Sequence, residues 1–312
     1  MPEDKDSWKF VHITDVHIGS PESYRFAPVW NEQWETAAQQ IKDIAPDLVL
    51  VGGDITRDGD TEPEQFANSI KHLNTLGIPW HLIPGNMDTG NKITDRPGAQ
   101  MPERNDVQLN VTEENLQIFR DLAAPFPWTL THRGIRFSGC YEIIKDTGLP
   151  SAAELDKFLV ELGELPPADH HIMLNHYPLF VDDIDEPQYD ITTMKEYHAW
   201  YFGVDPEPRK NLIDAYHASG VTHVLSGHIH CRRPSATIDG ITYIKGASTA
   251  MKQFGDRWPD GDDTLGFQVF TVTPEGIEYE FHPLTRISTR TDGWGPGGHP
   301  QGAKRMEKKP KN

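Results

Sequence analysis

The chain has 312 residues, with 47 acidic and 29 basic side chains and a formal net charge of −18. Hydrophobic residues make up 37% and aromatic residues 10% of it, which excludes a mainly disordered chain and leaves room for a large core. Most of such an acidic surface would repel a phosphate backbone, so a long nucleic-acid partner is not expected.

The first residues, MPEDKDSW, are charged and contain no apolar stretch of signal-peptide length. No run approaches the roughly 18 to 20 apolar residues of a membrane span. The two cysteines, Cys140 and Cys231, lie in separate apolar runs, which is typical of reduced thiols rather than of a disulfide framework. These features predict a cytoplasmic protein that does not enter a membrane, and they leave its oligomeric state open.

Three short aliphatic runs near the N-terminus alternate with two segments of helical periodicity. The runs cover residues 8–19, 46–56 and 78–88, and each ends in glycine and polar residues, which predicts buried parallel strands. Apolar residues recur at helical spacing over 30–44 and 66–76. The order β-α-β-α-β predicts a parallel sheet with right-handed crossovers.

The second half repeats the alternation and then changes character. We expect helices at about 112–122, 151–162 and 209–219, and strands over 134–144, 170–180 and 221–231, followed by antiparallel hairpins. Two interruptions, about 89–112 and 181–208, have the length of lids or substrate loops. The expected organisation is one domain over 1–285 and a flexible, Gly-, Pro- and Lys-rich tail over 286–312.

Metal-binding side chains follow the predicted strands at five places. Because ligands of open α/β sheets bind beyond the carboxyl ends of the strands, the five loops are expected to deliver these side chains to one site. Two of the loops carry a pair of residues two positions apart, which would project from one face of an extended backbone. The candidate ligands are Asp15, His17, Asp54, Asn86, His176, His228 and His230.

Carboxylates, imidazoles and an amide suit Mn, Fe, Zn or Mg rather than copper(I) or an iron–sulfur cluster. The set exceeds the needs of one ion, whereas two ions roughly 3.5 to 4 Å apart, bridged by a carboxylate, would use all of it. Asp54, which follows Gly52 and Gly53, is the expected bridging ligand. Any one of these residues alone is more often a turn former or a hydrogen-bonded polar residue, so the argument depends on their shared position.

The segments DVH, GGD, GNMD, NHYP and GHIH, in this order and spacing, resemble the calcineurin-like metallophosphoesterase superfamily, and most of all its cyclic-nucleotide phosphodiesterase-like group. The resemblance runs from about Trp8 to Leu284 and implies a four-layer αββα sandwich of the α/β class. It also implies phosphate-ester hydrolysis by a hydroxide that bridges two divalent or trivalent ions, with Mn, Fe or Zn expected. By the same resemblance, one ion takes Asp15, His17, Asp54 and His230, and the other takes Asp54, Asn86, His176 and His228.

Met87 departs from the family pattern, in which histidine usually follows the asparagine. That histidine is thought to protonate the leaving oxygen or to steady the phosphate, and a thioether has no acidic proton. Asp88 in the same loop and His198 in the second insertion are candidate replacements. The expected catalytic residues are therefore Asp54, Asn86, His176 and Asp88.

A missing proton donor favours substrates with weakly basic leaving groups, and superfamily members without this histidine tend to resemble phosphodiesterases. We therefore expect a small phosphodiester as substrate, with nucleotides as one possibility. The alternatives are a protein or small-molecule phosphomonoesterase, and a catalytically impaired scaffold that still binds metal. Arg57, Arg96 and Arg104 follow metal-bearing strands and are weaker candidates for phosphate binding.

Overall fold

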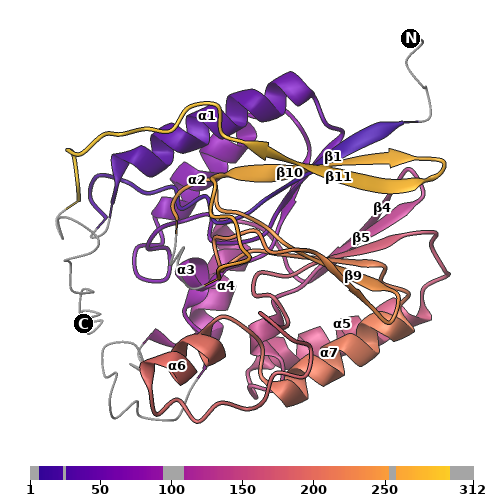
Figure 1. Ribbon diagram of the computed structural model, residues 1–312. Coiled ribbons are helices and arrows are strands. Elements are labelled where there is room, and N and C mark those ends of the chain that lie inside the picture. Colours follow the sequence, from indigo (N-terminus) through magenta and orange to yellow (C-terminus); the bar gives the residue numbers. More distant parts are fainter. Residues whose placement is uncertain (1–6, 24–25, 94–108, 253–257, 296–312) are drawn as a thin grey trace.

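The computed structural model describes residues 7–23, 26–93, 109–252 and 258–295, and it contains two mixed β-sheets (Figure 1). The first sheet has the strand order β11-β10-β1-β2-β3. Strands β1, β2 and β3 are parallel, as the sequence predicts, and the hairpin β10–β11 adds to them in antiparallel fashion. The bounds are β1 (Trp8–Ile13), β2 (Leu48–Val51), β3 (Trp80–Leu82), β10 (Gly266–Thr273) and β11 (Gly276–Pro283).

The second sheet has the order β4-β5-β6-β7-β9-β8. Its four central strands are parallel, and each edge is closed by an antiparallel strand. The parallel strands of both sheets therefore bring their carboxyl ends to the loops that carry the candidate ligands. The bounds are β4 (Trp128–His132), β5 (Ile135–Gly139), β6 (His171–Leu174), β7 (His223–Ser226), β8 (Ala236–Ile238) and β9 (Ile241–Lys245).

Helices cover the outer face of each sheet (Figure 1). Helices α1 (Pro28–Ile44) and α2 (Gln65–Asn74) pack on the first sheet, and α5 (Pro150–Glu164) and α7 (Pro206–Ala218) pack on the second. Helix α4 (Glu113–Leu122) contacts both α2 and α5. The arrangement confirms the predicted αββα sandwich. Three short elements lie in loops: α3 (Asn86–Thr89), η2 (Glu142–Ile144) and α6 (Met194–Tyr201).

The space between the sheets is filled by side chains from alternate strand positions. Phe10 of β1 stacks on Phe270 at 4.5 Å between ring centroids and meets Phe137 of the facing sheet edge-on at 5.2 Å. Its neighbour Val11 points the other way, into the core under α1. Because the central strands are buried on both faces, they appear in the sequence as continuous apolar runs, and every residue of β2 is buried.

Several boundaries differ from the sequence prediction. The strand predicted over 134–144 ends at Gly139 and continues as η2, and the one predicted over 170–180 ends at Leu174. Edge strand β4 was not predicted, because its half-buried positions form no apolar run. Within the predicted tail, Arg290 pairs with Glu32 of α1 at 3.1 Å, and the Gly295 amide donates to the Phe26 carbonyl. Residues 296–312 lie outside the described residues.

Cys140 and Cys231 are buried free thiols, as predicted. Among the helices of the described ranges, none has the length and apolar character needed to cross a membrane. Of the two predicted insertions, most of the first (94–108) lies outside the described residues, and the second (181–208) contains α6.

His171 begins β6 and provides a test of the second sheet's packing. Its imidazole is buried, with one nitrogen 2.8 Å from the Ser138 hydroxyl and the other 3.0 Å from the Ser219 carbonyl oxygen. Burial lowers its pKa from 6.5 to about 4. Because the folded form resists protonation, the stability that neutral His171 contributes is complete above pH 6.5 and is lost as the pH falls from 6.5 toward 4.

We expect His171→Gln to remove the part of the pH dependence of the unfolding free energy that comes from His171. At about 1.4 kcal/mol per pH unit, the loss of unfolding free energy between pH 6.5 and pH 5 should be about 2 kcal/mol smaller in the variant than in the wild type. Urea unfolding of both proteins with a chelator present measures the difference. An equally steep loss in the variant would show that His171 does not titrate on unfolding.

Candidate metal centre

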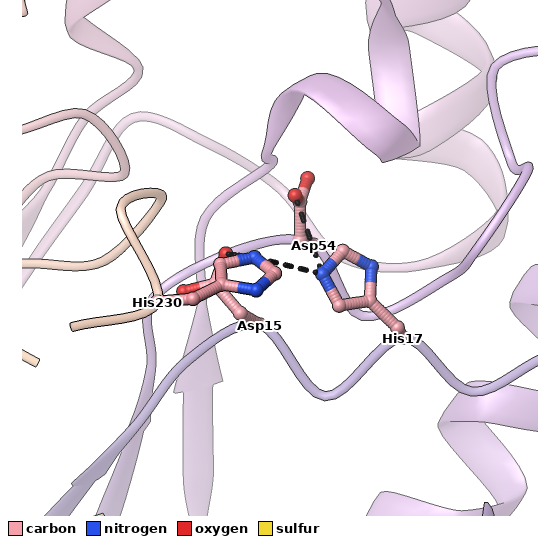
Figure 2. A group of neighbouring side chains, drawn as sticks. All are labelled: Asp15, His17, Asp54 and His230. Carbon is pink, nitrogen blue, oxygen red and sulfur yellow. Dashed lines mark hydrogen bonds and ion pairs between the residues drawn. The ribbon is translucent and has the colours of Figure 1, made fainter. Parts of the chain in front are cut away.

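Two groups of buried side chains meet at the carboxyl ends of the strands. The first contains Asp15, His17, Asp54 and His230, and the second contains Asp54, His176 and His228, with the ligand atoms of each group within 4.8 Å of one another. Figure 2 shows the first group, whose side chains come from the loops after β1, β2 and β7 and point toward one another. Asp54 belongs to both groups, as expected of a bridging ligand.

Asn86 joins the second group through its amide oxygen, which lies 3.1 Å from Nε2 of His176. All the ligand side chains named from the sequence therefore lie in one cluster, and each is nearly inaccessible to solvent. The resemblance implied the same division into two sets. The structure thus forms a site suited to two metal ions.

The ligand loops have a backbone conformation that the sequence did not reveal. Both pairs of residues two apart were expected to lie on extended backbone, but β1 ends at Ile13 and β7 at Ser226, before the ligands begin. The ligands instead adopt a left-handed conformation, with φ between 45° and 65° at Asp15, His17, Asp54, His228 and His230. Such residues cost on the order of 1 kcal/mol or more each and cluster at functional sites.

Two glycines allow these loops to approach one another. A Cβ on Gly227 would lie 1.9 Å from the Thr14 hydroxyl and 2.5 Å from the Asp15 carboxylate. A Cβ on Gly85 would lie 2.2 Å from the Asp54 carboxylate. The glycines that precede Asn86 and His228 in their motifs are therefore required by close contact between neighbouring loops.

Each of the four imidazoles has one nitrogen at a backbone carbonyl oxygen, which leaves the other for the centre. The carbonyls belong to Thr56 for His17 (3.3 Å), Gly52 for His176 (2.7 Å), Tyr201 for His228 (3.2 Å) and Met251 for His230 (2.9 Å). Histidines that bind metals almost always donate their second N–H in this way, because it fixes the tautomer and the ring orientation.

The inner atoms of the first group fit a cation. Nε2 of His17 and Nε2 of His230 lie 3.1 Å apart, and Oδ1 of Asp15 lies 3.2 Å from Nε2 of His230. Burial opposes ionisation of Asp15, but the imidazoles of His230, His176 and His17 hold its pKa well below its usual range. An ionised carboxylate beside two imidazole nitrogens is a donor set for a divalent or trivalent ion.

The pKa values of the imidazoles are shifted in opposite directions, even within the second group. Burial and the nearby His230 hold the pKa of His17 well below 6.5, and burial with His176 does the same for His228. Burial also lowers the pKa of His176, but the Asp54 carboxylate more than offsets this and raises it to about 10. Neutral imidazole is the form that binds metals, so metal and proton compete for His176.

Asp88, proposed from the sequence as a catalytic helper, is occupied by backbone contacts. Its Oδ2 accepts hydrogen bonds from the amides of Gly85 (2.9 Å) and Ile55 (3.3 Å), and its Oδ1 accepts from the amide and hydroxyl of Thr56. Burial and the neighbouring Asp54 raise its pKa to about 7. These contacts join two ligand loops and favour a structural role for Asp88 over donation of a proton to the substrate.

Two further residues organise the centre and were not found from the sequence. Glu142, which opens η2, is fully buried and accepts hydrogen bonds from the amides of His176 (3.0 Å) and Tyr177 (2.6 Å) and from the Asn175 side chain. Tyr201, at the end of α6, has its hydroxyl 3.2 Å from the amide nitrogen of Asn86. Neither belongs to a motif, since their partners lie far away in the chain.

The other candidates are not part of the ligand cluster. The guanidinium of Arg57 lies over the Trp30 ring, 5.0 Å from its centroid, and its charge contributes to the low pKa of His17. That position keeps Arg57 as a candidate for phosphate binding. Arg96 and Arg104 lie outside the described residues.

Comparison with known proteins identifies the family. The chain matches the calcineurin-like phosphoesterase family over residues 9–232, a range that includes every ligand loop. The chain belongs to this family. Its αββα sandwich and its two ligand groups around Asp54 are those of a metal-dependent phosphoesterase.

Relatives with full-length similarity are named phosphatases. The chain is 28% identical to human serine/threonine-protein phosphatase CPPED1 over 319 residues, covering 93% of this chain and 90% of the relative. The zebrafish (Danio rerio) protein of the same name is 23% identical, covering 90% and 86%. A 3′,5′-cyclic-nucleotide phosphodiesterase of Nostoc is 34% identical over 81 residues, which is 25% of this chain and 30% of the relative.

Solved structures with the same fold include a purple acid phosphatase from yellow lupin seeds (TM-score 0.59, 14% identity). The match covers 92% of this chain and 53% of that one. A second is GAP50, described as the anchor in the inner membrane complex of Plasmodium, with a TM-score of 0.54 and 16% identity over 91% of this chain and 87% of that one. At these identities the comparison establishes the fold alone.

The shared carboxylate gives a direct test of the two-ion site. We expect Asp54→Asn to reduce the bound metal from two ions per chain to one or none, because both groups lose their common anionic ligand. Metal analysis of protein purified without chelator measures the content. Asp214→Asn, an equivalent change at an exposed position of helix α7, is the matched control, and equal metal content in the two variants would refute the bridging role.

Proposed function

We propose that the protein hydrolyses small phosphate esters at a site for two metal ions and that it acts on phosphodiesters in preference to monoesters. The observation that carries the proposal is the pair of buried ligand groups that share Asp54. When bound, two such ions supply Lewis-acid polarisation of the phosphoryl oxygens and an activated water.

The protein's own residues orient this chemistry. The carbonyls that hold the four imidazoles, and the amides that hold Asp88, fix the ligand loops before substrate arrives. Such preorganised electrostatic stabilisation is usually the largest contribution to catalysis, and it does not depend on residue 87. The site therefore supports hydrolysis even though one proton-transfer group of the family is missing.

The leaving group is where this chain differs from its family. Met87 is 6% exposed, its sulfur lies 3.4 Å from the amide nitrogen of Asn86, and it has no proton to donate. Asp88 is turned toward the backbone, so neither residue that follows Asn86 is placed to protonate a leaving oxygen. Esters whose leaving group is weakly basic need this step least, which favours activated esters such as aryl phosphodiesters.

A serine/threonine phosphatase is the second candidate, and the names of the full-length relatives favour it. Phosphoserine has an alkoxide leaving group, which is strongly basic and gains most from a proton donor. The phosphatase role therefore requires a donor from outside the loop that carries Met87, and it predicts good turnover of a phosphoserine peptide.

Restoring histidine at position 87 tests the leaving-group argument. We expect Met87→His to raise kcat on alkyl phosphate esters by at least about 10-fold, and by up to the roughly 10² to 10⁴ typical of acid catalysis, and to change kcat on aryl esters little. Steady-state kinetics on matched aryl and alkyl diesters measures the ratio. Met87→Leu, which adds no donor, is the control, and an equal gain on both ester types would count against this explanation.

A substrate panel with the manganese-loaded protein separates the two candidates. We expect kcat/KM to be highest for an aryl phosphodiester, lower for the corresponding aryl monoester and lowest for a phosphoserine peptide. A phosphoserine peptide that is turned over faster than the diester would establish the phosphatase function instead. Turnover no greater than that of Asp54→Asn on all three would leave a metal-binding scaffold.

A further inference from the structure

Tyr201, the last residue of α6, contacts two ligands of the second group by different atoms. Its hydroxyl lies 3.2 Å from the amide nitrogen of Asn86, and its carbonyl oxygen lies 3.2 Å from Nε2 of His228. Asn86 follows β3 of the first sheet and His228 follows β7 of the second. One residue of the insertion thus connects ligand loops from both sheets.

The hydroxyl contact decides which end of the Asn86 amide faces the metal position. The amide nitrogen is surrounded by acceptors: the Tyr201 hydroxyl, Oδ1 of Asn91 at 3.1 Å and the sulfur of Met87 at 3.4 Å. The Tyr201 hydroxyl in turn donates to Oδ1 of Asn91 at 3.4 Å. Because an amide nitrogen has no lone pair for a cation, holding it here directs the oxygen toward His176 and the metal position.

The carbonyl contact selects the tautomer of His228. Donation from Nε2 to the Tyr201 carbonyl leaves Nδ1 as the nitrogen available for an ion. The ring is also stacked on Tyr177, with centroids 3.6 Å apart and an interplanar angle of 23°. Tyr201 and Tyr177 together therefore fix both the proton and the plane of this ligand.

Helix α6 is held in place by the same loop that carries Asn86. The Lys92 ammonium donates to the carbonyls of Trp200 (2.8 Å) and Gly203 (3.0 Å) and pairs with Asp205 at 3.1 Å. An eight-residue helix is marginal on its own, and a cation at its C-terminus stabilises its last carbonyls. Lys92 is buried, with its ammonium 4.4 Å from the centroid of the Trp200 ring.

We propose that α6 helps to form the second metal position by orienting two of its ligands. Tyr201 is the positioning residue that orients Asn86 and His228, and Lys92 holds the helix that presents it. The affinity of the second group for a divalent cation then depends on whether α6 is packed in this position. The imidazoles of the first group take their carbonyl partners from the loops of Thr56 and Met251, so its affinity does not depend on the helix. The inference rests on the proposed two-ion function.

Tyr201→Phe is the sharpest test, because it removes the hydroxyl and keeps both the ring and the backbone carbonyl. We expect calorimetric titration of the metal-stripped full-length protein with Mn²⁺ to show an unchanged affinity at the first group (Asp15, His17, Asp54 and His230), which is the first affinity below; the second affinity is that of the second group. The second affinity should fall about 10- to 100-fold, as is typical when a partner of a metal ligand is lost. Tyr279→Phe, the same change on exposed strand β11, should leave both affinities unchanged.

A kinetic readout separates positioning from direct chemistry. If Tyr201 acts through the metal ligands, the activity that Tyr201→Phe loses at limiting Mn²⁺ should be recovered at saturating Mn²⁺. A loss of kcat that persists at saturation would overturn the proposal in favour of direct contact with substrate.

Lys92→Met provides an independent variant that leaves Tyr201 intact. We expect the same selective weakening of the second Mn²⁺ affinity, with the first affinity and the circular dichroism spectrum retained. An equal fall in both affinities would show that Lys92 only stabilises the fold, and unchanged affinities in Tyr201→Phe would also overturn the proposal. If the wild type binds a single ion, the two-ion function itself fails, and with it this inference.

Discussion

The centre depends on a single electrostatic constraint, the convergence of buried carboxylates and imidazoles whose lone pairs need a cation or a proton between them. Nε2 of His17 faces Nε2 of His230 at 3.1 Å, and the Asp15 and Asp54 carboxylates are buried beside them. Burying such groups costs several kcal/mol each without compensation. The loop geometry, the glycines and the carbonyl partners of the imidazoles all serve to hold this arrangement together.

The sandwich fold supplies the rigidity that the arrangement requires. Ligand residues in a left-handed conformation would relax if the strands before them could shift, so the ends of β1, β2 and β7 must be fixed. The inter-sheet core around Phe10 fixes the first sheet against the second, and Asp88 ties the loop after β2 to the loop after β3. A buried core and a buried carboxylate thus offset the cost of backbone strain at the ligands.

The sequence predicted the elements that have a local signature. Continuous apolar runs identified the central strands, and their polar ends identified the candidate ligands that the structure brings together, because parallel strands in one sheet must end at the same edge. Left-handed backbone has no such signature in Asp or His. The convergence of the candidate ligands was therefore predicted on the assumption of extended backbone. Edge strand β4 and the contacts of residues 286–295 were missed, because half-buried segments show no clear period.

The role of Tyr201 was beyond sequence reasoning for a different reason. It meets Asn86 across 115 positions of the chain, and within an aromatic insertion nothing marks it apart from its neighbours. For Asp88, proximity to a candidate ligand suggested chemistry, and the structure adds four hydrogen bonds, from the amides of Gly85, Ile55 and Thr56 and from the Thr56 hydroxyl, that the sequence did not reveal.

Met87 and Tyr201 together describe how this site departs from the family pattern. The thioether sulfur of Met87 and the phenol oxygen of Tyr201 both lie near the amide nitrogen of Asn86, at 3.4 and 3.2 Å. The Asn86 amide is thus oriented both by Asn91 of its own loop and by Tyr201 of the insertion. The proposed change in leaving-group protonation therefore concerns residue 87, while both groups of candidate ligands are present in the structure.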